Sequence, residues 1–410
     1  MSKRARDETT TSARDLVEIK LVGAEAFPGE TSFAPDYVHQ IFEDEKVGDV
    51  SPELRLECLF NDVTLDVCLR ATGAPLRGAA EDALYTLAGA LPTAQTESEF
   101  AATLQRPPPD GEALVGPLLG EYTRGGRTFR IHCGALHAAA QAPSFMRGLQ
   151  ALMRFYIETW SDVDEDERWR VVAVFEAAER PRLVAAATIF HFQRWLTHAD
   201  ALPLQRAAGP ALVVRLCQAI VMPQFRSQGH GAQLLQAVYT HAHAEGAIEL
   251  TVEDPNPRFR MVRDVVDYRN CHSLGLLPPD SLAAAAPLEA VGEARRKLLL
   301  THEQATRCHE LRQYVQLAGE LAAVDEADTE AREAVVKPWR LKVKRRLSRQ
   351  HQEELDPTVL AAEAEAAGET LSAAELVERR KARLEELYEE TVGEYRLLSH
   401  RLGVAAHKKA

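Results

Sequence analysis

The sequence predicts a mixed α/β (α+β, mixed-sheet) protein with a helical C-terminal part, and three observations carry this prediction. Residues 212–221 are mostly apolar and include β-branched side chains, which is typical of a strand buried on both faces. Glycines and then leucines at helical spacing follow, and residues 248–252 alternate as a further strand. Residues 276–410 are rich in Ala, Glu, Leu and Arg, which favours several helices. We expect a disordered terminus, an N-terminal α/β domain, an α/β core and a helical domain at residues 1–15, 16–110, 111–275 and 276–410.

Within the core, residues 212–252 read as a strand, a tight glycine turn, a helix and a second strand. Pro223 cannot donate a ladder hydrogen bond, so the first strand should end there. Gly229 and Gly231 allow a sharp bend and a close approach of the backbone to a ligand. The free N–H groups of the helix's first turn then point at one spot, where the helix dipole favours an anion. This segment therefore predicts a site for a phosphorylated ligand.

Two common phosphate-binding motifs fit this turn poorly. A P-loop would end in Gly-Lys-Ser/Thr, whereas the chain has His230-Gly231-Ala232. A dinucleotide fingerprint needs a third glycine where Leu234 stands, and an acid about twenty residues later. Glu253 roughly meets the second condition, but the first condition fails.

The pattern Arg226-x-x-Gly229-x-Gly231 after a buried strand resembles the acetyl-CoA motif of the GNAT superfamily of N-acetyltransferases. The runs at 228–235 (QGHGAQLL), 252–255 (VEDP) and 262–264 (VRD) further resemble the type B histone acetyltransferase catalytic subunits. This resemblance covers about residues 16–350. It is weak in residues 73–110, a connecting region expected to hold one or two short helices, and in the C-terminal helices.

The resemblance implies a GNAT-type core that transfers acetyl from acetyl-CoA to lysines in the N-terminal tail of free, newly made histone four. It further implies direct transfer without a covalent enzyme intermediate, a WD-repeat histone chaperone as partner, and residence in nucleus and cytoplasm. Two alternatives stay open at this point. One is an acetyltransferase of the same fold acting on another protein or a small amine, and the other is an inactive histone-escort protein.

By family position, backbone groups of three residues hold the pantetheine and polarise the thioester carbonyl, and the glycine turn holds the diphosphate. Asn256 is a further expected contact. The expected cofactor-binding residues are Ala219, Ile220, Val221, Arg226, Ser227, Gln228, Gly229, His230, Gly231, Ala232 and Asn256.

The expected general base is a carboxylate, because removing a proton from a lysine ammonium at pH 7 costs roughly 4–5 kcal/mol. By resemblance the base is Glu253, with Glu158 as second candidate and Asp254 as third. Burial and mutual repulsion of Glu253 and Asp254 should raise at least one pKa, and strand alternation should turn one of them into the cleft. Cys217 lies in the buried run, so we expect it to pack rather than react.

For the histone tail, the resemblance points to acidic and aromatic side chains: Asp44, Glu45, Trp169, Phe190, His191 and Phe192. Residues 156–169 place six acids between aromatics, and the family has a similar segment by its substrate channel. Phe190 and Phe192 lack the hydroxyl groups that tyrosines at these positions would supply. We therefore expect them to pack on an aliphatic lysine stem without hydrogen-bonding to the tail. An acidic surface loop and ordinary core aromatics are the structural alternatives.

Composition limits the remaining possibilities. The formal net charge of −13 disfavours a protein that grips nucleic acid with its whole surface and suits a basic partner. The six cysteines show no C-x-x-C pair, and the histidines form no metal-spaced set, so no metal site is expected. No membrane segment is expected. The basic run at 337–349 is assigned a structural or partner role, and residues 373–402 are expected to form one long helix, with a capping box at Ser372 and Glu375 and a stop at Gly403.

Overall fold

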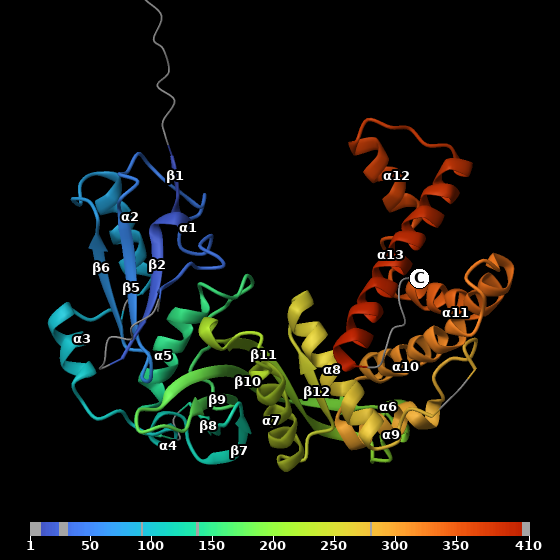
Figure 1. The fold of residues 1–410 in the computed structure, drawn as a ribbon, viewed down its shortest axis with the longest axis horizontal. Helices are drawn as coiled ribbons and strands as arrows, with labels where there is room; N and C mark the ends of the chain where they lie inside the picture. Colours follow the sequence, from blue (N-terminus) through green and yellow to red (C-terminus); the bar gives the residue numbers. More distant parts are fainter. Residues whose placement is uncertain (1–9, 24–31, 92, 137–138, 279–280, 404–410) are drawn as a thin grey trace, which may run out of the picture. The chain divides into compact units, whose positions relative to one another are not determined.

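The computed structural model describes residues 10–23, 32–91, 93–136, 139–278 and 281–403. The chain divides into two compact units (Figure 1). The first comprises Met1–Arg194 and Leu212–Asp254 and contains the β-sheets, and the second comprises Trp195–Ala211 and Pro255–Ala410 and is mainly helical. The predicted fold class, a mixed α/β core with a helical C-terminal region, is confirmed.

The N-terminal part of the first unit is built on a four-stranded sheet with the order β3-β2-β5-β6 (Figure 1). Its strands are β2 (Val17–Val22), β3 (Ser32–Phe33), β5 (Arg55–Asn61) and β6 (Val67–Thr72). Strand β2 pairs with β5 in parallel, and β5 pairs with β6 as an antiparallel hairpin. In the turn between them, the Asn61 side-chain oxygen accepts the N–H groups of Val63 and Thr64, at 2.9 and 3.1 Å.

The extreme N-terminus is more ordered than predicted. Residues 1–9 lie outside the described part of the chain, but β1 (Thr11–Ser12) and α1 (Ala13–Leu16) follow at once. The side chains of Ala13 and Leu16 are buried, and the Ala13 N–H donates to the Glu45 carbonyl oxygen at 2.9 Å. The expected disordered segment of residues 1–15 was therefore too long, because buried apolar contacts hold its end.

The remaining short elements of this part are β4 (Lys46–Val47), α2 (Ala79–Ala90), α3 (Glu97–Leu104) and α4 (Gly111–Leu114). Strand β4 pairs with β1. Helices α2 and α3 are the two short helices expected in the connecting region. The capping box at Thr96 and Glu99 fixes the start of α3, because each residue's side chain bonds the other's backbone N–H.

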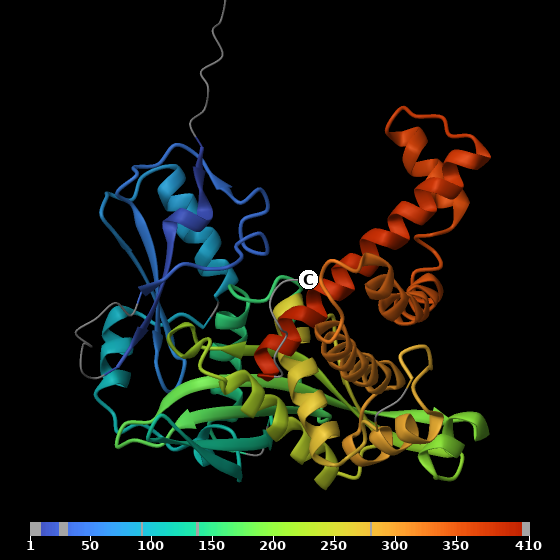
Figure 2. The same ribbon diagram turned by 45° about the vertical axis from the view of Figure 1, so that its right-hand side comes forward.

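The second sheet has six strands in the order β12-β11-β10-β9-β8-β7. They are β7 (Leu118–Arg124), β8 (Arg127–Ala135), β9 (Trp169–Glu176), β10 (Arg182–Leu196), β11 (Gly209–Val221) and β12 (Glu249–Val252). Helix α7 (His230–Ala244), yellow-green in Figure 2, packs against β7, β8, β9 and β12. The predicted strands at 212–221 and 248–252 are confirmed as β11 and β12.

Strand β11 differs from its prediction in one respect. Buried and half-buried residues alternate along its second half, so it is not covered on both faces. It pairs in parallel with β12 from Val213 to Leu216 only. Residues 217–221 extend past the end of β12, which leaves that edge of β11 without a paired strand in the described structure. A 3-10 helix of three residues, Pro223–Phe225, follows, and β11 ends before Pro223 as predicted.

The second unit contains α6 (His198–Leu204) and the helices α8 (Pro257–Ser273), α9 (Leu288–Leu298), α10 (His302–Ala322), α11 (Thr329–Gln350), α12 (Pro357–Ala366) and α13 (Ala373–Leu402). Helix α13 has the predicted bounds, with the capping box at Ser372 and Glu375 and a left-handed Gly403 at its end. Helix α8 was expected in the core, but it groups with the helices α9, α10 and α13, against which it packs.

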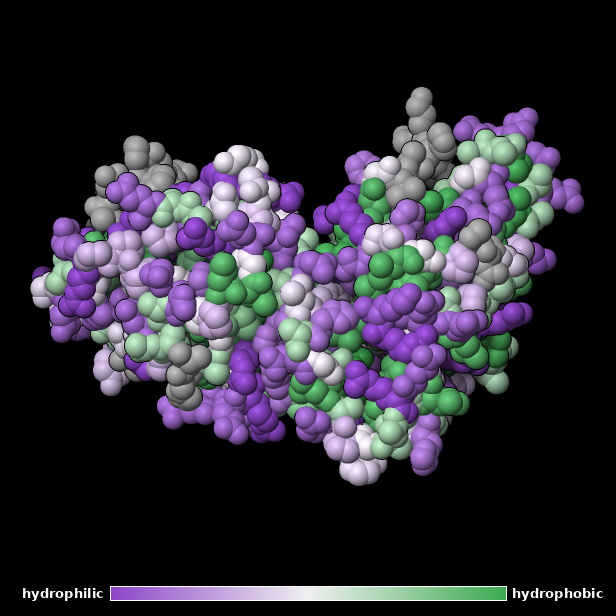
Figure 3. All heavy atoms as spheres, turned by 90° about the horizontal axis from the view of Figure 1, so that it is seen from below, coloured by the Kyte–Doolittle hydropathy of each residue, from purple (hydrophilic) through white to green (hydrophobic). Residues whose placement is uncertain are grey.

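Hydrophilic residues cover much of the face drawn in Figure 3, and hydrophobic residues lie on it in separate patches. Exposed large hydrophobic side chains include Trp195, Leu202 and Leu288, which is ordinary for a folded surface. Among the described helices, none is both long and apolar enough to cross a membrane.

Helix α5 (Ala142–Met153) gives a test of packing inside the first unit. A Cβ added to Gly148 would lie 2.3 Å from the Leu65 carbonyl oxygen, in the hairpin turn. We expect Gly148→Ala to lower the free energy of unfolding by about 1–3 kcal/mol, because the backbone must shift to relieve the overlap. Gly89→Ala in α2 is the control, since its Cβ would meet nothing within 4 Å. Denaturant unfolding of both variants is the measurement, and equal stability of the two would contradict this packing.

Candidate active site

The turn between β11 and α7 has the geometry expected of an anion site. Helix α7 begins at Gly229, whose φ of 84° lies in the left-handed region, and Ser227 is also left-handed with φ 60°. No side chain caps this helix end. The N–H groups of an α-helix's first turn have no partner within the helix, so here they can bind an anion.

The two glycines of the turn do different things. A Cβ on Gly229 would lie 2.6 Å from the Arg124 guanidinium carbon, so this position excludes a side chain both by its φ and by its neighbour. A Cβ on Gly231 would meet Val221 at 3.5 Å, which is ordinary contact. Only Gly229 is therefore required by the fold. Arg124, at the end of β7, adds a positive charge against the turn that the sequence alone did not indicate.

His230 was predicted to bind the cofactor, and its ring does not face a ligand. The ring is 1% exposed and packs against Phe129 and Phe225, with Nδ1 hydrogen-bonded to the Tyr122 hydroxyl at 2.6 Å. Burial, and then the positive charge of Arg124, lowers the pKa of His230 below its ordinary value. Only the backbone of His230 is left for ligand binding, and its neutral ring anchors the turn to the sheet.

The side chains of two other predicted cofactor residues are also engaged within the protein. Arg226 pairs with Asp36 at 3.2 Å, donates to the Val221 carbonyl oxygen at 3.3 Å and lies over the Tyr156 ring. Gln228 donates to the Gln224 carbonyl oxygen at 2.9 Å. These contacts shape the turn, so the ligand-binding groups that remain are mainly backbone N–H groups. Ser227 is exposed, and Gly231 and Ala232 are half-buried.

The predicted pantetheine-binding residues Ala219, Ile220 and Val221 lie in the free edge of β11, past its pairing with β12. An extended ligand can hydrogen-bond to such an edge as an added strand would. Asn256 caps α8, where its side-chain oxygen accepts the Phe259 N–H at 2.9 Å. That oxygen is therefore already satisfied by the helix.

Glu253 and Asp254 come directly after β12, so they lie in a turn and not within the strand as predicted. The Glu253 N–H donates to the Leu216 carbonyl oxygen at 2.9 Å, which continues the parallel pairing by one step. Asp254 then turns away with φ 33°. Strand alternation does not apply to a turn, and both side chains are exposed, so the expected burial is absent. Only bound reactants could desolvate these carboxylates.

Cys217 lies beside Glu253. Its thiol hydrogen is within reach of the Glu253 carboxylate and of the Arg215 carbonyl oxygen, 3.7 Å from Sγ. Burial, and then the hydrogen bond to Glu253, raises the pKa of Cys217 far above its ordinary value. The side chain is half-buried rather than buried as predicted. The residue therefore contacts the candidate base, and its thiol is held protonated.

The acidic segment at 156–169 is tied to the same strand. Gln218 on β11 donates to the Ser161 carbonyl oxygen at 2.6 Å and accepts from the Thr188 hydroxyl at 3.3 Å. The segment's exposed carboxylates are Glu158, Asp162, Asp164, Glu165 and Glu167. The Arg168 guanidinium holds the pKa of Asp166 at about 2. Gln218, which the sequence did not single out, thus ties this acidic segment to strand β11.

Glu158 and the predicted tail contacts Asp44 and Glu45 are all exposed. Glu158 is held through its carbonyl oxygen, which accepts from Gln40 at 2.9 Å. Glu45 adopts φ 52° in the loop before β4. Both predicted groups are thus available to a basic ligand, and neither is brought into contact with Glu253.

The predicted aromatic cluster is divided between two faces of the sheet. Phe190 packs on Trp169 with ring centroids 4.8 Å apart, and Arg215 lies over Phe192 at 4.9 Å. His191 is instead buried toward α7, where its Nε2 lies 3.1 Å from the His241 Nε2. Its prediction as a substrate contact was wrong, because side chains of neighbouring strand residues point to opposite faces.

Burial lowers the pKa of His191 to about 4, so this ring is neutral at neutral pH.

Among the described residues, no group of three or more His, Cys, Asp or Glu side chains is placed to hold a metal ion.

Comparison with known proteins gives two matches to family models. Residues 9–158 match the model described as "Histone acetyl transferase HAT1 N-terminus", and residues 140–260 match "Acetyltransferase (GNAT) family". The second match contains β11, the glycine turn, α7 and the two carboxylates.

Relatives are found along most of the chain. The chain is 25% identical to the histone acetyltransferase type B catalytic subunit of Homo sapiens, over 96% of this chain and 94% of that protein. It is 28% identical to the protein of the same name from Schizosaccharomyces pombe, over 46% of this chain and 48% of that protein. A solved acetyltransferase domain bound to a K105-CoA conjugate matches at 12% identity and a TM-score of 0.27, covering 35% of this chain and 88% of the other.

The contrast between the two glycines predicts different effects of the same substitution. Gly229→Ala forces a left-handed φ on a side chain and displaces Arg124, so we expect the free energy of unfolding to fall by about 1–3 kcal/mol. Gly231→Ala lies in the helix with open contacts and should leave stability unchanged or raise it by up to about 1 kcal/mol. Thermal unfolding of the two variants checks this, and equal losses would show that the turn has another conformation.

Proposed function

We propose that this chain, which is similar along most of its length to the type B histone acetyltransferase catalytic subunits, transfers acetyl groups and that the acceptor is a lysine of a histone tail. The acceptor we propose in particular is the N-terminal tail of free histone four, and the acetyl donor is acetyl-CoA. The observation that supports this most directly is the placement of an exposed carboxylate, Glu253, and of an acidic segment at the same strand, β11.

The residues present fit acetyl-CoA. The free edge of β11 at 217–221 offers backbone N–H and C=O groups to the pantetheine amides, and the uncapped first turn of α7 offers N–H groups to the diphosphate. Arg124 adds a cation beside that turn. When bound, acetyl-CoA supplies an activated acyl group as a thioester. Backbone N–H groups at the edge of β11 are suited to stabilise the negative charge that develops on the carbonyl oxygen.

Glu253 is the base we propose for the acceptor amine. Deprotonating a lysine ammonium at pH 7 costs roughly 4–5 kcal/mol, and a carboxylate that takes the proton as the amine attacks lowers this cost. The backbone of Glu253 is fixed by its hydrogen bond to Leu216, so its carboxylate starts from a defined position next to Cys217. Covering of this exposed group by both reactants would desolvate it at the moment of transfer.

The acceptor's chemistry follows from acidic and aromatic side chains of the first unit. Exposed carboxylates of the acidic segment at 156–169 attract a lysine- and arginine-rich peptide, which also suits the chain's net charge of −13. Trp169, Phe190 and Phe192 supply aromatic surface on which aliphatic lysine stems can pack. A small amine needs neither feature, so they favour a basic tail as acceptor.

The relatives carry the word "subunit" in their names, and we propose that this chain also has a partner. The partner we expect is a WD-repeat histone chaperone, in nucleus and cytoplasm. Co-purification of the full chain with such a chaperone, with and without histone four, is the direct measurement.

The role of Glu253 predicts the effect of removing its charge. Glu253→Gln keeps the side chain's size but cannot accept the proton, so we expect kcat to fall by about 10²–10⁴-fold on a histone-four tail peptide. Glu158→Gln and Asp254→Asn should each cost tenfold or less. Steady-state assays with acetyl-CoA over a range of pH make the comparison. A larger loss in Glu158→Gln than in Glu253→Gln would assign the base to Glu158 instead.

The same assay separates peptide specificity from catalysis. Retained acetyl-CoA binding without transfer to the tail peptide would keep the fold and move the acceptor to another protein or a small amine. Tail binding without any transfer to any acceptor would favour a histone-escort protein.

Direct transfer predicts a small effect of removing the Cys217 thiol. The thiol is held protonated and hydrogen-bonded to Glu253, so it is a poor nucleophile. We expect Cys217→Ala to keep at least about one tenth of the wild-type kcat. Mass spectrometry of the enzyme quenched during turnover should reveal no acetyl group on Cys217. An acetylated Cys217, together with loss of activity in the variant, would establish a covalent intermediate instead.

A further inference from the structure

The helical unit contains a cavity of about 720 Å³ that the acetyl-transfer reaction does not use. Side chains from α8, α9, α10, α11 and α13 line it, so it is walled on several sides. Pockets for small molecules typically have volumes of a few hundred to a thousand Å³. The size of this cavity therefore suits a compact ligand.

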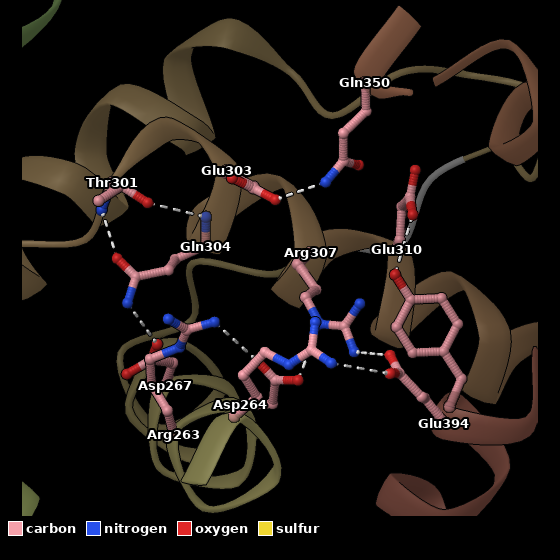
Figure 4. Close-up of polar contacts among 12 residues, drawn as sticks. Arg263, Asp264, Asp267, Thr301, Glu303, Gln304, Arg307, Glu310, Gln350 and Glu394 are labelled. Atoms are coloured by element: carbon pink, nitrogen blue, oxygen red, sulfur yellow. Dashed lines mark hydrogen bonds and ion pairs between the residues drawn. The ribbon is translucent and has the colours of Figure 1, made fainter. Parts of the chain in front are cut away.

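Ion pairs hold the wall of this cavity in place. Arg307 on α10 donates to Asp264 on α8 at 2.8 Å and to Glu394 on α13 at 2.5 Å (Figure 4). Arg346 on α11 donates through Nε to both oxygens of Glu310, at 2.9 and 3.0 Å. Glu310 also accepts the hydroxyl of Tyr395, at 2.9 Å. These bonds join four helices and give the cavity a fixed shape.

Two arginines of the cavity keep buried donors that no described residue satisfies. Nη2 of Arg346 and Nε of Arg263 are buried and make no hydrogen bond within the described residues. Arg263 Nη2 lies 3.9 Å from the Asp264 carboxylate. A buried donor without an acceptor costs about 1–3 kcal/mol, and more for a charged group. Because these two atoms have no exposed surface, an oxygen-rich ligand would reach them only after the two arginine side chains turn toward the cavity.

The balance of charge points to an anion. Four carboxylates line the cavity, and Asp264, which pairs with Arg307, brings their number to five. Six cations line it: Arg260, Arg263, Arg307, Lys342, Arg346 and Arg349. The carboxylates Glu310 and Glu394 are already bonded to Arg346 and Arg307. Arg349 at the rim donates to the Arg345 carbonyl oxygen of its own helix at 3.2 Å, and no described carboxylate forms an ion pair with it.

We propose that this cavity binds a small polyanion that carries several phosphoryl groups. Guanidinium groups pair with phosphate oxygens through two parallel hydrogen bonds, and several arginines around one volume match several phosphoryl groups. Arg263 and Arg346 supply the inner contacts, and Arg349 supplies an outer one. The ligand would bridge α8 and α11 and so stabilise the helical unit. This binding is separate from the acetyl-transfer site.

The test is calorimetric titration of sodium tripolyphosphate into the full chain in the presence of saturating coenzyme A, which occupies the turn before α7. We expect one tripolyphosphate per chain and a raised unfolding midpoint. Arg263→Gln and Arg349→Gln should each weaken binding by at least about tenfold while leaving acetyl transfer unchanged. Arg379→Gln is the matched control, because Arg379 is paired with Glu369 on the surface of the same unit and does not line the cavity.

Each other outcome overturns the proposal. Absence of binding at millimolar tripolyphosphate, or equal weakening by the cavity variants and the control, would leave only non-specific attraction to arginines. Binding seen without coenzyme A and lost with it would assign the phosphate to the turn before α7. Tighter binding of a hexaglutamate peptide than of tripolyphosphate would make the occupant an acidic chain segment. Circular dichroism checks that Arg263→Gln is folded. If that variant is unfolded, the result for Arg349→Gln, at the exposed rim, decides the test.

Discussion

The early end of the parallel pairing between β11 and β12 controls the geometry of the candidate active site. Because pairing stops at Leu216, the next five residues of β11 present an unpaired edge on which an extended ligand can bind. The same break allows the Glu253 N–H to make the last bond of the ladder before the chain turns at Asp254. The ligand edge and the candidate base are therefore consequences of one structural event. A longer β12 would cover the edge and move the carboxylate away from Cys217.

Around that break, the side chains form hydrogen bonds and ion pairs within the protein, and the backbone N–H groups remain available to bind a ligand. His230, Arg226 and Gln228 all stand in the turn that the sequence assigns to the cofactor, and all three side chains are bonded within the protein. This arrangement is consistent with anion recognition by N–H groups, which need a fixed backbone more than they need charged side chains. Arg124 and Gln218 serve the same end from neighbouring strands, the first by closing on Gly229 and the second by tying down the acidic segment.

What the sequence predicted well depended on local chemistry. The start and end of α13 follow from Ser372, Glu375 and Gly403, and the turn before α7 follows from Gly229, because capping and left-handed φ values are properties of a few adjacent residues. What it missed depended on contacts between distant residues. The pairing of Gln218 with Ser161 and the burial of His191 against His241 each join residues about fifty positions apart. Coverage of β11 on one face and the grouping of α8 with the C-terminal helices are likewise set by packing, which periodicity does not reveal.

The chain's net charge of −13 conceals two local environments of opposite character. In the first unit, the exposed carboxylates between residues 158 and 167 outnumber the cations that pair with them, which favours a basic acceptor. In the second unit, arginines line a cavity and outnumber the carboxylates there. Ionic screening over about 8–10 Å at physiological salt makes the local set of charges, rather than the total, decide which ligand each site attracts. An acidic protein can therefore hold a basic peptide at one site and a polyanion at another, provided that each site supplies its own charges.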